Sequence, residues 1–342
     1  MTRRGKVPPV GPFARVAVLG GGAWGTALAL VAARADRDTV LWARDAATVT
    51  AINETATNPA YLPGLGLDPP VAATTDPAVA ASADLVIAAV PTQSLRATLA
   101  LFAPIIRAGT PVVSAAKGLE RGSHDTPSAV IAATLPRCRP AVLSGPSFAV
   151  DVAKGLPTAL TIAAVDMALA ERIAETLASP SFRPYASDDI VGVELGGALK
   201  NIIAIAAGIV AGRGLGASAQ AALTARGFAE MSRLAARLGA RPSTLMGLSG
   251  LGDLMLSTAS AQSRNFSLGL GIGAGRPLSE LTGPGARLAE GAFTAAVAIE
   301  LAGERGVEMP IAHAVADVLA GALSVDAAVV RLMTRPLKAE AD

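Results

Sequence analysis

A short apolar run near the start of the chain ends in glycines and continues into a helical pattern. The segment RVAVLGGGAWGTALALVAARA begins at Arg15 and contains Gly20, Gly22 and Gly25 in the spacing G-x-G-x-x-G. The first glycine allows a tight turn, the second lets the backbone approach a pyrophosphate, and the third lets the helix pack on the strand. Because such a turn presents N–H groups at a helix N-terminus, the segment predicts dinucleotide binding. A glycine-rich turn without a ligand is the alternative.

The second strand candidate, Thr39 to Asp45 (TVLWARD), bears on the choice of dinucleotide. An acidic residue at the end of this strand would bind the ribose 2′-hydroxyl of NAD, whereas an arginine can pair with the 2′-phosphate of NADP. Arg44 favours NADPH, and the adjacent Asp45 leaves NADH open. An exposed pair that caps the next helix is the third interpretation.

Further strand candidates follow at intervals and alternate with helical segments such as Ser94 to Ile106 and Met167 to Leu177. These strands begin at Val71, Asp84, Thr110, Pro140 and Thr158. The alternation predicts a parallel, doubly wound sheet of the Rossmann type. Ligands on such sheets lie beyond the carboxyl ends of the strands. The segments VPTQ, AAKG and SGPSFA occupy those ends, so Lys117 of AAKG should face the cofactor.

After about Asp188 long helical patterns replace the alternation. They cover residues 189–212, 217–238, 262–274, 287–305 and 311–321. The sequence therefore predicts an α/β domain followed by an all-α domain, as expected for a chain of 342 residues. The expected limits are a flexible tail at 1–14, a dinucleotide-binding domain at 15–189 and a helical substrate-binding domain at 190–342.

Composition argues against several classes of function. The net charge is +2, only 3% of residues are aromatic, and no dense basic run is present, so a nucleic-acid partner is not expected. Cys138 is the only cysteine, which excludes an internal disulfide or a thiolate metal cluster and fits a reducing cytoplasm. The start lacks the apolar region of a secretory signal. The apolar run from Leu195 to Gly212 contains Lys200 and Asn201, which favours a buried helix over a membrane span.

Lysine is rare in this chain. Of 29 basic residues only five are lysine, namely Lys6, Lys117, Lys154, Lys200 and Lys338. A desolvated lysine can donate and accept a proton near neutral pH, which arginine cannot. Lys117 and Lys200 are therefore candidates for proton chemistry, and chance retention at a tolerant position is the alternative.

Small residues accompany Lys200 along one helix face. Gly196, Lys200, Ala204 and Gly208 share that face at a spacing of four residues. They predict a shallow groove in which a ligand approaches the lysine. Close helix packing with Lys200 directed outward to solvent is equally compatible with this geometry.

The segment GLSGLGDLMLSTASAQSRNF, which begins at Gly247, carries the other polar candidates. Asp253 lies among glycines and could orient a lysine. Arg264 and Asn265 lie near a helix start, where a guanidinium and an amide suit a small phosphate. A solvated surface arginine is the alternative for Arg264 taken alone.

Taken together, these motifs resemble the bacterial NAD(P)-dependent sn-glycerol-3-phosphate dehydrogenases over nearly the whole chain. The shared segments are GGGAWGTALAL, NPAYLPG, AVPTQ, AKGLE, LSGPSFA, FRPY, GVELGGALKNIIAIAAG, TARGFAEMSRL, GLSGLGDL, SRNFSLG and the EG at Glu290. The direct succession of Lys200 and Asn201 separates the chain from the β-hydroxyacid dehydrogenases. The resemblance implies a 6-phosphogluconate-dehydrogenase-like fold and interconversion of dihydroxyacetone phosphate and sn-glycerol 3-phosphate for phospholipid synthesis.

The resemblance also implies roles for individual residues. The cofactor contacts would be Ala23, Trp24, Arg44, Lys117, Ala149, Arg264, Leu288 and Glu290. The substrate contacts would be Lys117, Gly145, Ser147, Lys200, Asp253, Ser263, Arg264 and Asn265. Ser257 replaces the usual threonine four residues after the aspartate, and Ser147 stands where some members have threonine. Both substitutions keep the hydroxyl, so activity is expected to persist.

A mechanism can be written from the polar residues. Lys200 would give the proton to the ketone oxygen, and Lys117 would polarise the carbonyl. Asp253 and Asn201 would hold the Lys200 ammonium, and no metal is required. The competing hypotheses are another two-domain hydroxyacid dehydrogenase, which needs a carboxylate clamp, and a non-catalytic NADPH-binding sensor. Helices rich in small residues make a homodimer the expected assembly.

Overall fold

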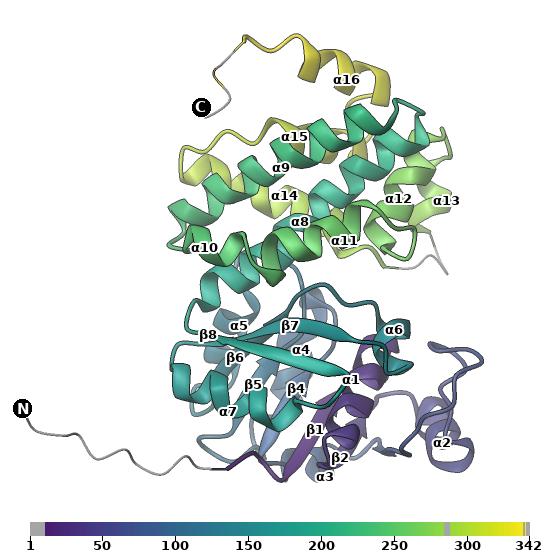
Figure 1. Ribbon diagram of the computed structural model, residues 1–342, viewed down its shortest axis with the longest axis vertical. Coiled ribbons are helices and arrows are strands. Elements are labelled where there is room, and N and C mark those ends of the chain that lie inside the picture. Colours follow the sequence, from purple (N-terminus) through teal and green to yellow (C-terminus); the bar gives the residue numbers. More distant parts are fainter. Residues whose placement is uncertain (1–10, 284–287, 338, 340–342) are drawn as a thin grey trace, which may run out of the picture.

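The computed structural model describes residues 11–283, 288–337 and 339, and it consists of a helix-flanked β-sheet joined to a layer of helices (Figure 1). One sheet has the strand order β3-β2-β1-β4-β5-β6-β7-β8. Its strands are β1 (Arg15–Leu19), β2 (Asp38–Trp42), β3 (Ala72–Thr74), β4 (Leu85–Ala88), β5 (Pro111–Ser114), β6 (Arg139–Ser144), β7 (Thr158–Ala164) and β8 (Phe182–Ser187). The order reverses between β1 and β4, which is the topological switch point of a dinucleotide-binding sheet.

The sheet is parallel, as expected, except at one edge. Strands β1 to β6 are parallel, but β7 pairs with β6 in the antiparallel direction, and β8 is parallel to β7. The chain turns back after β6 through a loop that contains the short helix α6 (Ala149–Ala153). Strand β8 was not expected from the sequence. Its side chains are mostly part-exposed, so it lacks the continuous apolar run of the central strands.

Apolar cores cover both faces of the sheet. On β1 the side chains of Val16 and Val18 join one core, and those of Ala17 and Leu19 join the other. The first core includes α1 (Ala23–Arg34), α2 (Ala46–Thr55), α6 and α7 (Met167–Leu177). The second core includes α3 (Pro77–Ala81), α4 (Thr92–Phe102) and α5 (Pro127–Thr134). Burial on both faces explains why the central strands read as apolar runs without alternation.

The prediction of a flexible tail over residues 1–14 is wrong for Phe13. Residues 1–10 lie outside the described residues. Phe13 is 5% exposed, its N–H donates to Thr176 Oγ1 at 3.0 Å, and the guanidinium of Arg172 lies 3.7 Å from the centre of its ring. Phe13 is therefore part of the sheet core, and the ordered structure begins before β1.

The second layer is helical. Its elements are α8 (Ile190–Gly212), α9 (Ala217–Arg237), α10 (Pro242–Leu245), the π-helix η1 (Leu248–Gly252), α11 (Asp253–Thr258), α12 (Arg264–Gly273), α13 (Leu278–Thr282), α14 (Glu290–Glu304), α15 (Pro310–Leu319) and α16 (Val325–Met333). Helix α8 lies at the centre and packs against α9, α11, α12 and α14 (Figure 1). It is long and apolar enough to cross a membrane, but 89% of its apolar window is buried inside the protein. It is the core helix of this layer.

The chain passes from the sheet to the helices at a capped turn. Asp189 is the N-cap of α8, and its carboxylate accepts hydrogen bonds from Gly192 N at 2.9 Å and from Arg241 N at 2.9 Å. An acidic N-cap satisfies free N–H groups and complements the helix dipole. The direction in which α8 leaves the sheet is therefore fixed at its first turn.

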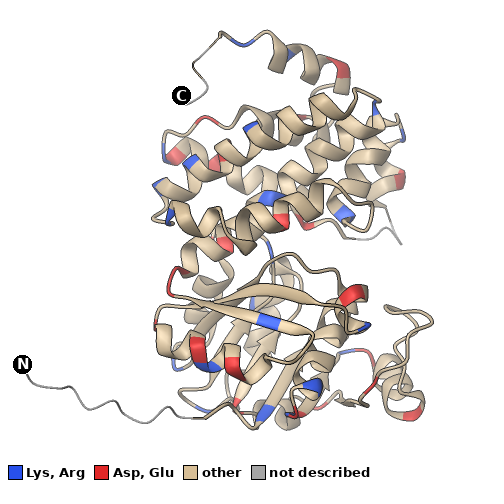
Figure 2. Ribbon diagram, viewed as in Figure 1, with Lys and Arg blue, Asp and Glu red and all other residues tan. Residues whose placement is uncertain are grey.

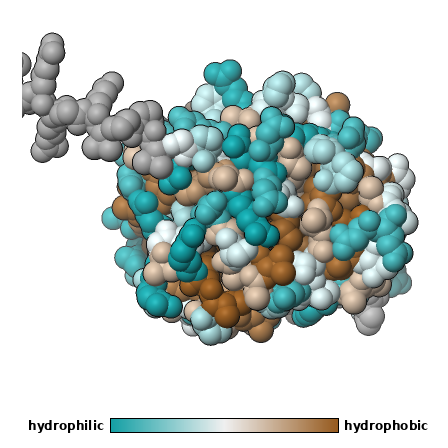
Figure 3. All heavy atoms as spheres, turned by 90° about the horizontal axis from the view of Figure 1, so that it is seen from below, coloured by the Kyte–Doolittle hydropathy of each residue, from teal (hydrophilic) through white to brown (hydrophobic). Residues whose placement is uncertain are grey.

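Charged side chains are distributed over both layers. Basic and acidic residues are interspersed on the ribbon, and the described residues form no separate basic stripe in this view (Figure 2). Seen from the end of the sheet layer, hydrophobic patches are interrupted by hydrophilic side chains (Figure 3). Exposed apolar surface of this kind is ordinary for a folded chain.

Candidate active site

The glycine-rich turn after β1 forms an open helix N-terminus. Gly20 has φ +123°, and a Cβ atom there would lie 2.6 Å from the Ala89 carbonyl oxygen. A Cβ on Gly25 would overlap the Gly20 carbonyl oxygen, so both glycines are required by the protein itself. Gly22, the N-cap of α1, has nothing within 4 Å of its Cβ position and makes no side-chain cap. The free N–H groups and the open space at Gly22 fit a pyrophosphate.

Ala23 and Trp24 form the first turn of α1 next to this space. The indole Nε1 of Trp24 is buried and has no hydrogen-bond partner among the described residues. A buried donor without a partner costs free energy, so a ligand acceptor at this position would remove that cost. The turn therefore has both the backbone and the side-chain donors that a dinucleotide would use.

Arg44 and Asp45, at the end of β2, differ in their contacts. Asp45 is the N-cap of α2 and accepts hydrogen bonds from Thr48 N at 3.0 Å and Thr48 Oγ1 at 2.6 Å. These hydrogen bonds lower the pKa of Asp45. Arg44 is exposed beside it. The capping interpretation is therefore correct for Asp45, and its carboxylate is engaged by its own helix.

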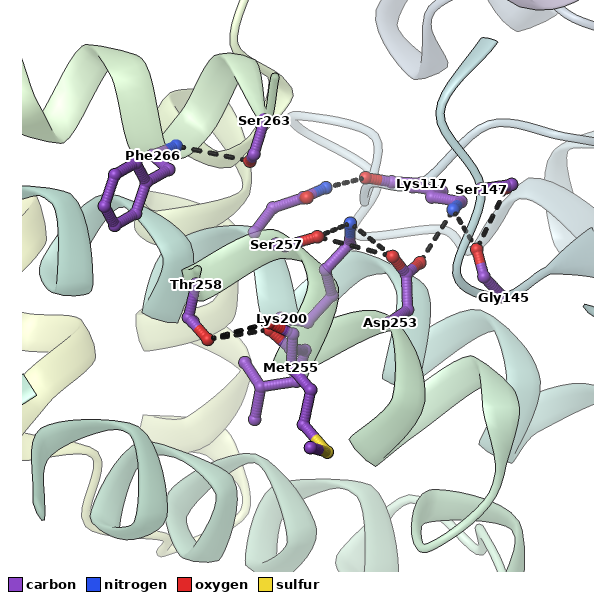
Figure 4. A network of polar contacts seen from close by, with 12 residues as sticks. Lys117, Gly145, Ser147, Lys200, Asp253, Met255, Ser257, Thr258, Ser263 and Phe266 are labelled. Carbon is purple, nitrogen blue, oxygen red and sulfur yellow. Dashed lines mark hydrogen bonds and ion pairs between the residues drawn. The ribbon is translucent and has the colours of Figure 1, made fainter. Parts of the chain in front are cut away.

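Two lysines from different layers meet at one carboxylate (Figure 4). Asp253 accepts from Lys117 Nζ through Oδ2 at 2.7 Å and from Lys200 Nζ through Oδ1 at 3.0 Å. Lys117 follows β5 at the carboxyl edge of the sheet, whereas Lys200 lies in α8 and Asp253 begins α11. The arrangement therefore joins the cofactor edge of the sheet to the helical layer.

The side chain of Lys200 is buried, with 7% exposed, so it is not directed outward to solvent. Besides Asp253, its ammonium donates to Ser257 Oγ at 2.6 Å. Burial lowers the pKa of Lys200 to about 8, and the attraction of Asp253 only partly opposes that effect. Burial by itself would raise the pKa of Asp253, but the charges of Lys117 and Lys200 outweigh it, so the pKa is lowered. The site thus holds an ionised carboxylate beside an amine that can titrate near neutral pH.

The expected role of Asn201 as a holder of the Lys200 ammonium is wrong. Its Nδ2 donates to the backbone carbonyl oxygen of Lys117 at 2.8 Å. Asn201 and Lys200 are adjacent on a helix, so their side chains point to different faces. Asn201 therefore links the backbone of Lys117 to α8.

The glycines near Lys200 do not clear space for a ligand. A Cβ on Gly196 would lie 2.8 Å from the Ser249 carbonyl oxygen in η1. A Cβ on Gly208 would overlap the carbonyl oxygen of Phe266 in α12. These glycines allow neighbouring backbones to approach α8, so the expectation of a substrate groove formed by this row is wrong.

The loop between β6 and α6 contributes a carbonyl to the same cluster. Gly145 has φ +151°, and its carbonyl oxygen accepts from Lys117 Nζ at 2.9 Å. The hydroxyl of Ser147 donates to the same oxygen at 3.1 Å. Ala149 begins α6 just beyond them. The structure thus brings Gly145 and Ser147 beside Lys117, and Ala149 follows in the same loop.

The start of α12 holds the phosphate candidates. Ser263 is the N-cap and accepts from Phe266 N at 3.3 Å. Asn265 is buried, and its Oδ1 accepts from Gly291 N at 3.0 Å. Arg264 is exposed at the first turn, and its charge contributes to the lowering of the pKa of Lys200. Arg264 therefore lies close enough to the lysine cluster for its charge to affect the pKa of Lys200.

A cavity of about 210 Å³ lies between α4 and α14. Leu288 and Glu290 line it from the helical layer, and Thr92 and Gly118 line it from the sheet layer. Glu290 Oε1 accepts from Thr92 N at 2.8 Å at the start of α4. The cavity adjoins Lys117 through Gly118, so it continues the candidate site toward α14.

Some residues of this region were not singled out in the sequence. Glu194 of α8 accepts hydrogen bonds from Ser128 of α5, and Thr92 binds Glu290 across the layers. Glu194 carries the same signal as Lys200, an ionisable residue in an apolar helix. Thr92 belongs to the VPTQ segment, but no contact was predicted for it. Ser128 gave no signal, because hydroxyl residues near helix starts are common.

Comparisons with known proteins give consistent results. Protein-family models for the NAD-dependent glycerol-3-phosphate dehydrogenase N-terminus and C-terminus match residues 15–170 and 189–330. Glycerol-3-phosphate dehydrogenase [NAD(P)+] from Bradyrhizobium sp. (strain BTAi1) is 58% identical over 96% of this chain and 99% of its own length. The protein of that name from Azorhizobium caulinodans is 55% identical over 96% and 99%. The crystal structure of glycerol-3-phosphate dehydrogenase from Coxiella burnetii has a TM-score of 0.89 at 37% identity, over 94% of this chain and 99% of that one.

Proposed function

The chain belongs to the NAD-dependent glycerol-3-phosphate dehydrogenase family, and from this premise we propose that it reversibly reduces dihydroxyacetone phosphate to sn-glycerol 3-phosphate. The electron donor is NADPH or NADH. The single observation that supports this proposal most strongly is the cluster of Lys117, Asp253 and Lys200 at the carboxyl edge of the sheet. Its product would supply the glycerol backbone of phospholipids.

The proposed chemistry needs a proton as well as a hydride. The reduced nicotinamide supplies the hydride to the C2 carbonyl carbon. Lys200 Nζ gives its proton to the carbonyl oxygen, which becomes the new hydroxyl. Lys117 polarises the same carbonyl, and Asp253 stays ionised and orients both ammonium groups. In the reverse direction neutral Lys200 accepts the hydroxyl proton.

The substrate phosphate is assigned to the start of α12. Arg264 offers a guanidinium fork. Asn265 Oδ1 accepts a hydrogen bond from Gly291 N, and Asn265 Nδ2 has no hydrogen-bond partner among the described residues. Ser263, Gly145 and Ser147 complete the substrate set. The dinucleotide is assigned to the glycine turn, with further contacts from Trp24, Ala149, Leu288 and Glu290.

We favour NADPH over NADH because of the end of β2. The carboxylate of Asp45 is engaged by Thr48 of α2, which leaves it poorly placed for a ribose 2′-hydroxyl. Arg44 is exposed at the same point and can pair with a 2′-phosphate.

The direct test is absorbance at the nicotinamide band. Purified protein, dihydroxyacetone phosphate and NADPH or NADH should give substrate-dependent loss of absorbance, faster with NADPH. Turnover of unphosphorylated hydroxyacids instead would support the general hydroxyacid dehydrogenase. Tight NADPH binding without turnover of any ketone would support the sensor.

The larger-scale proposals concern domains and assembly. We place the junction between the dinucleotide-binding domain, which includes Phe13, and the helical domain at the Asp189 cap. A homodimer in the cytoplasm stays a prediction, which sedimentation and cell fractionation would check.

A further inference from the structure

A buried carboxylate connects α8 to the sheet layer away from the lysine cluster. Glu194 is 6% exposed, and it accepts from Ser128 N at 2.6 Å and Ser128 Oγ at 2.7 Å. Ser128 lies in the first turn of α5, whose own N-cap residue, Thr126, makes no side-chain cap to the helix. Glu194 therefore caps α5 from the other layer of the protein.

The burial of this carboxylate needs a reason. No cationic side chain among the described residues forms an ion pair with Glu194, so only hydrogen bonds and the α5 dipole compensate its charge. Burial raises the pKa of Glu194 to about 7, with the Ser128 hydrogen bonds opposing the rise. A buried, ionisable group without a counter-charge is costly, and an apolar residue would pack here at lower cost.

The position of Glu194 along α8 suggests why a carboxylate is buried there. Glu194, Gly197 and Asn201 have helical spacing i, i+3 and i+7, so they share one face. All three meet the sheet layer: a Cβ on Gly197 would lie 2.5 Å from Ser144 Oγ, and Asn201 binds the Lys117 carbonyl. Lys200 lies on the neighbouring face and binds Asp253 and Ser257. The rotation of α8 about its axis thus sets where Lys200 points.

We propose that Glu194 is a positioning residue, which, by binding Ser128 at the start of α5, holds α8 in the rotation that places Lys200 opposite Lys117. This inference rests on the proposed function, because the reaction needs both lysines at one carbonyl. Glu194 does not touch substrate or cofactor. Small displacements of reacting groups are expensive in rate, and a shift of about 1 Å can cost about 100-fold.

The central variant is Glu194→Ala, which removes both hydrogen bonds. We expect kcat for dihydroxyacetone phosphate reduction to fall by about 10- to 100-fold, with the dissociation constant for NADPH unchanged. Glu194→Gln keeps an oxygen for Ser128 N and an amide that can donate to Ser128 Oγ. It should restore kcat to within about threefold of wild type.

A matched control separates positioning from stability. Glu230 is also buried and caps a helix start, accepting from Ile311 N at 2.8 Å and Ala312 N at 3.2 Å in α15. Both of its partners lie in the helical layer, so Glu230→Ala should lower Tm and leave kcat unchanged well below that temperature. If Glu194→Ala cannot be purified, Ser128→Ala decides, and it should lower kcat several-fold.

Four outcomes are decisive. The proposal is overturned if Glu194→Ala, or Ser128→Ala in its place, keeps wild-type kcat. It is also overturned if Glu194→Gln is as slow as Glu194→Ala, or if Glu230→Ala loses kcat equally. A wild-type enzyme without turnover of dihydroxyacetone phosphate would contradict the proposed function itself, and this inference with it.

Discussion

The proposed proton transfer depends on the surroundings of one buried ammonium group, that of Lys200. Lys200 has two polar partners, Asp253 and Ser257, and Asp253 is shared with Lys117. Burial is the main cause that lowers the pKa of Lys200, and one carboxylate shared by two lysines only partly opposes it. The pKa of Lys200 therefore falls to about 8, near the pH at which a proton donor is most effective.

The pH dependence of the reaction follows from this value. In the proposed mechanism ketone reduction needs protonated Lys200. The ratio kcat/KM, which reports the free enzyme, should therefore be level below pH 8 and fall tenfold per pH unit above it. Oxidation of sn-glycerol 3-phosphate needs the neutral amine and should rise through the same pH. Initial rates in both directions between pH 7 and 10 would check this prediction. A fall in the rate above pH 8 in both directions would contradict it.

Arg264 should act on the substrate phosphate. Replacing it with alanine removes a charged hydrogen-bond donor worth about 1.5 to 3 kcal/mol, so KM for dihydroxyacetone phosphate should rise by about 10- to 100-fold. The unphosphorylated ketone should be affected little, and Arg264→Lys should recover part of the loss because it keeps the charge without the fork. Equal effects of Arg264→Ala on both ketones would rule out a phosphate role.

At the scale of elements, α8 and α12 approach each other through glycines on both helices. Gly208 and Gly212 of α8 face Gly269 and Gly273 of α12, each pair four residues apart. A Cβ on Gly208 would overlap the Phe266 carbonyl oxygen, and one on Gly269 would overlap that of Ile205. The close contact places the start of α12, with Arg264 and Asn265, beside the helix that carries Lys200.

This contact can be tested with two glycine substitutions. Gly269→Ala should destabilise the protein by about 3 kcal/mol, because neither backbone can move away without repacking. Gly303→Ala in α14, where nothing lies within 4 Å of the Cβ position, should be neutral or slightly stabilising. Thermal or urea unfolding would measure both, and similar Tm values for the two variants would refute the account of the α8 and α12 contact.

Sequence patterns predicted the elements that bury regular apolar surface. The central strands and helices such as α8, α9 and α14 were expected close to their observed limits. Strand β8, the reversal at β7 and the π-helix η1 were not expected, because they depend on edge pairing and on close backbone contacts rather than on periodicity. The prediction that the glycines of α8 leave space for a substrate was wrong because these glycines also serve close backbone contacts.

The sequence predicted the main residues of the candidate site and the contact of Asp253 with Lys200, but not most of the other contacts. Lys117, Lys200 and Asp253 were identified by residue type and motif, and the structure brings them into contact. The sharing of Asp253 by both lysines, the bond from Asn201 to the Lys117 carbonyl and the cap by Glu194 join residues 53 to 136 positions apart. Local sequence patterns carry no information about such pairings.

At the scale of the whole molecule, each of the two layers contributes part of the candidate site. In the proposed mechanism the sheet layer supplies the glycine turn, Arg44 and Lys117, and the helical layer supplies Lys200, Asp253 and Arg264. Contacts across the junction include the hydrogen bond between Glu290 and Thr92 and the apolar cluster of Val142, Ala163 and Val193. Cofactor binding and proton transfer should therefore be separable by mutation.

The most direct test is Lys200→Ala, measured for NADPH binding and for turnover on the same preparation. We predict an unchanged dissociation constant for NADPH and a kcat for dihydroxyacetone phosphate reduction lower by about 10² to 10⁴. Lys154→Ala, which alters an exposed lysine in the sheet layer, should match wild type in both. Turnover of Lys200→Ala within a few-fold of wild type would contradict the assignment of Lys200 as the proton donor.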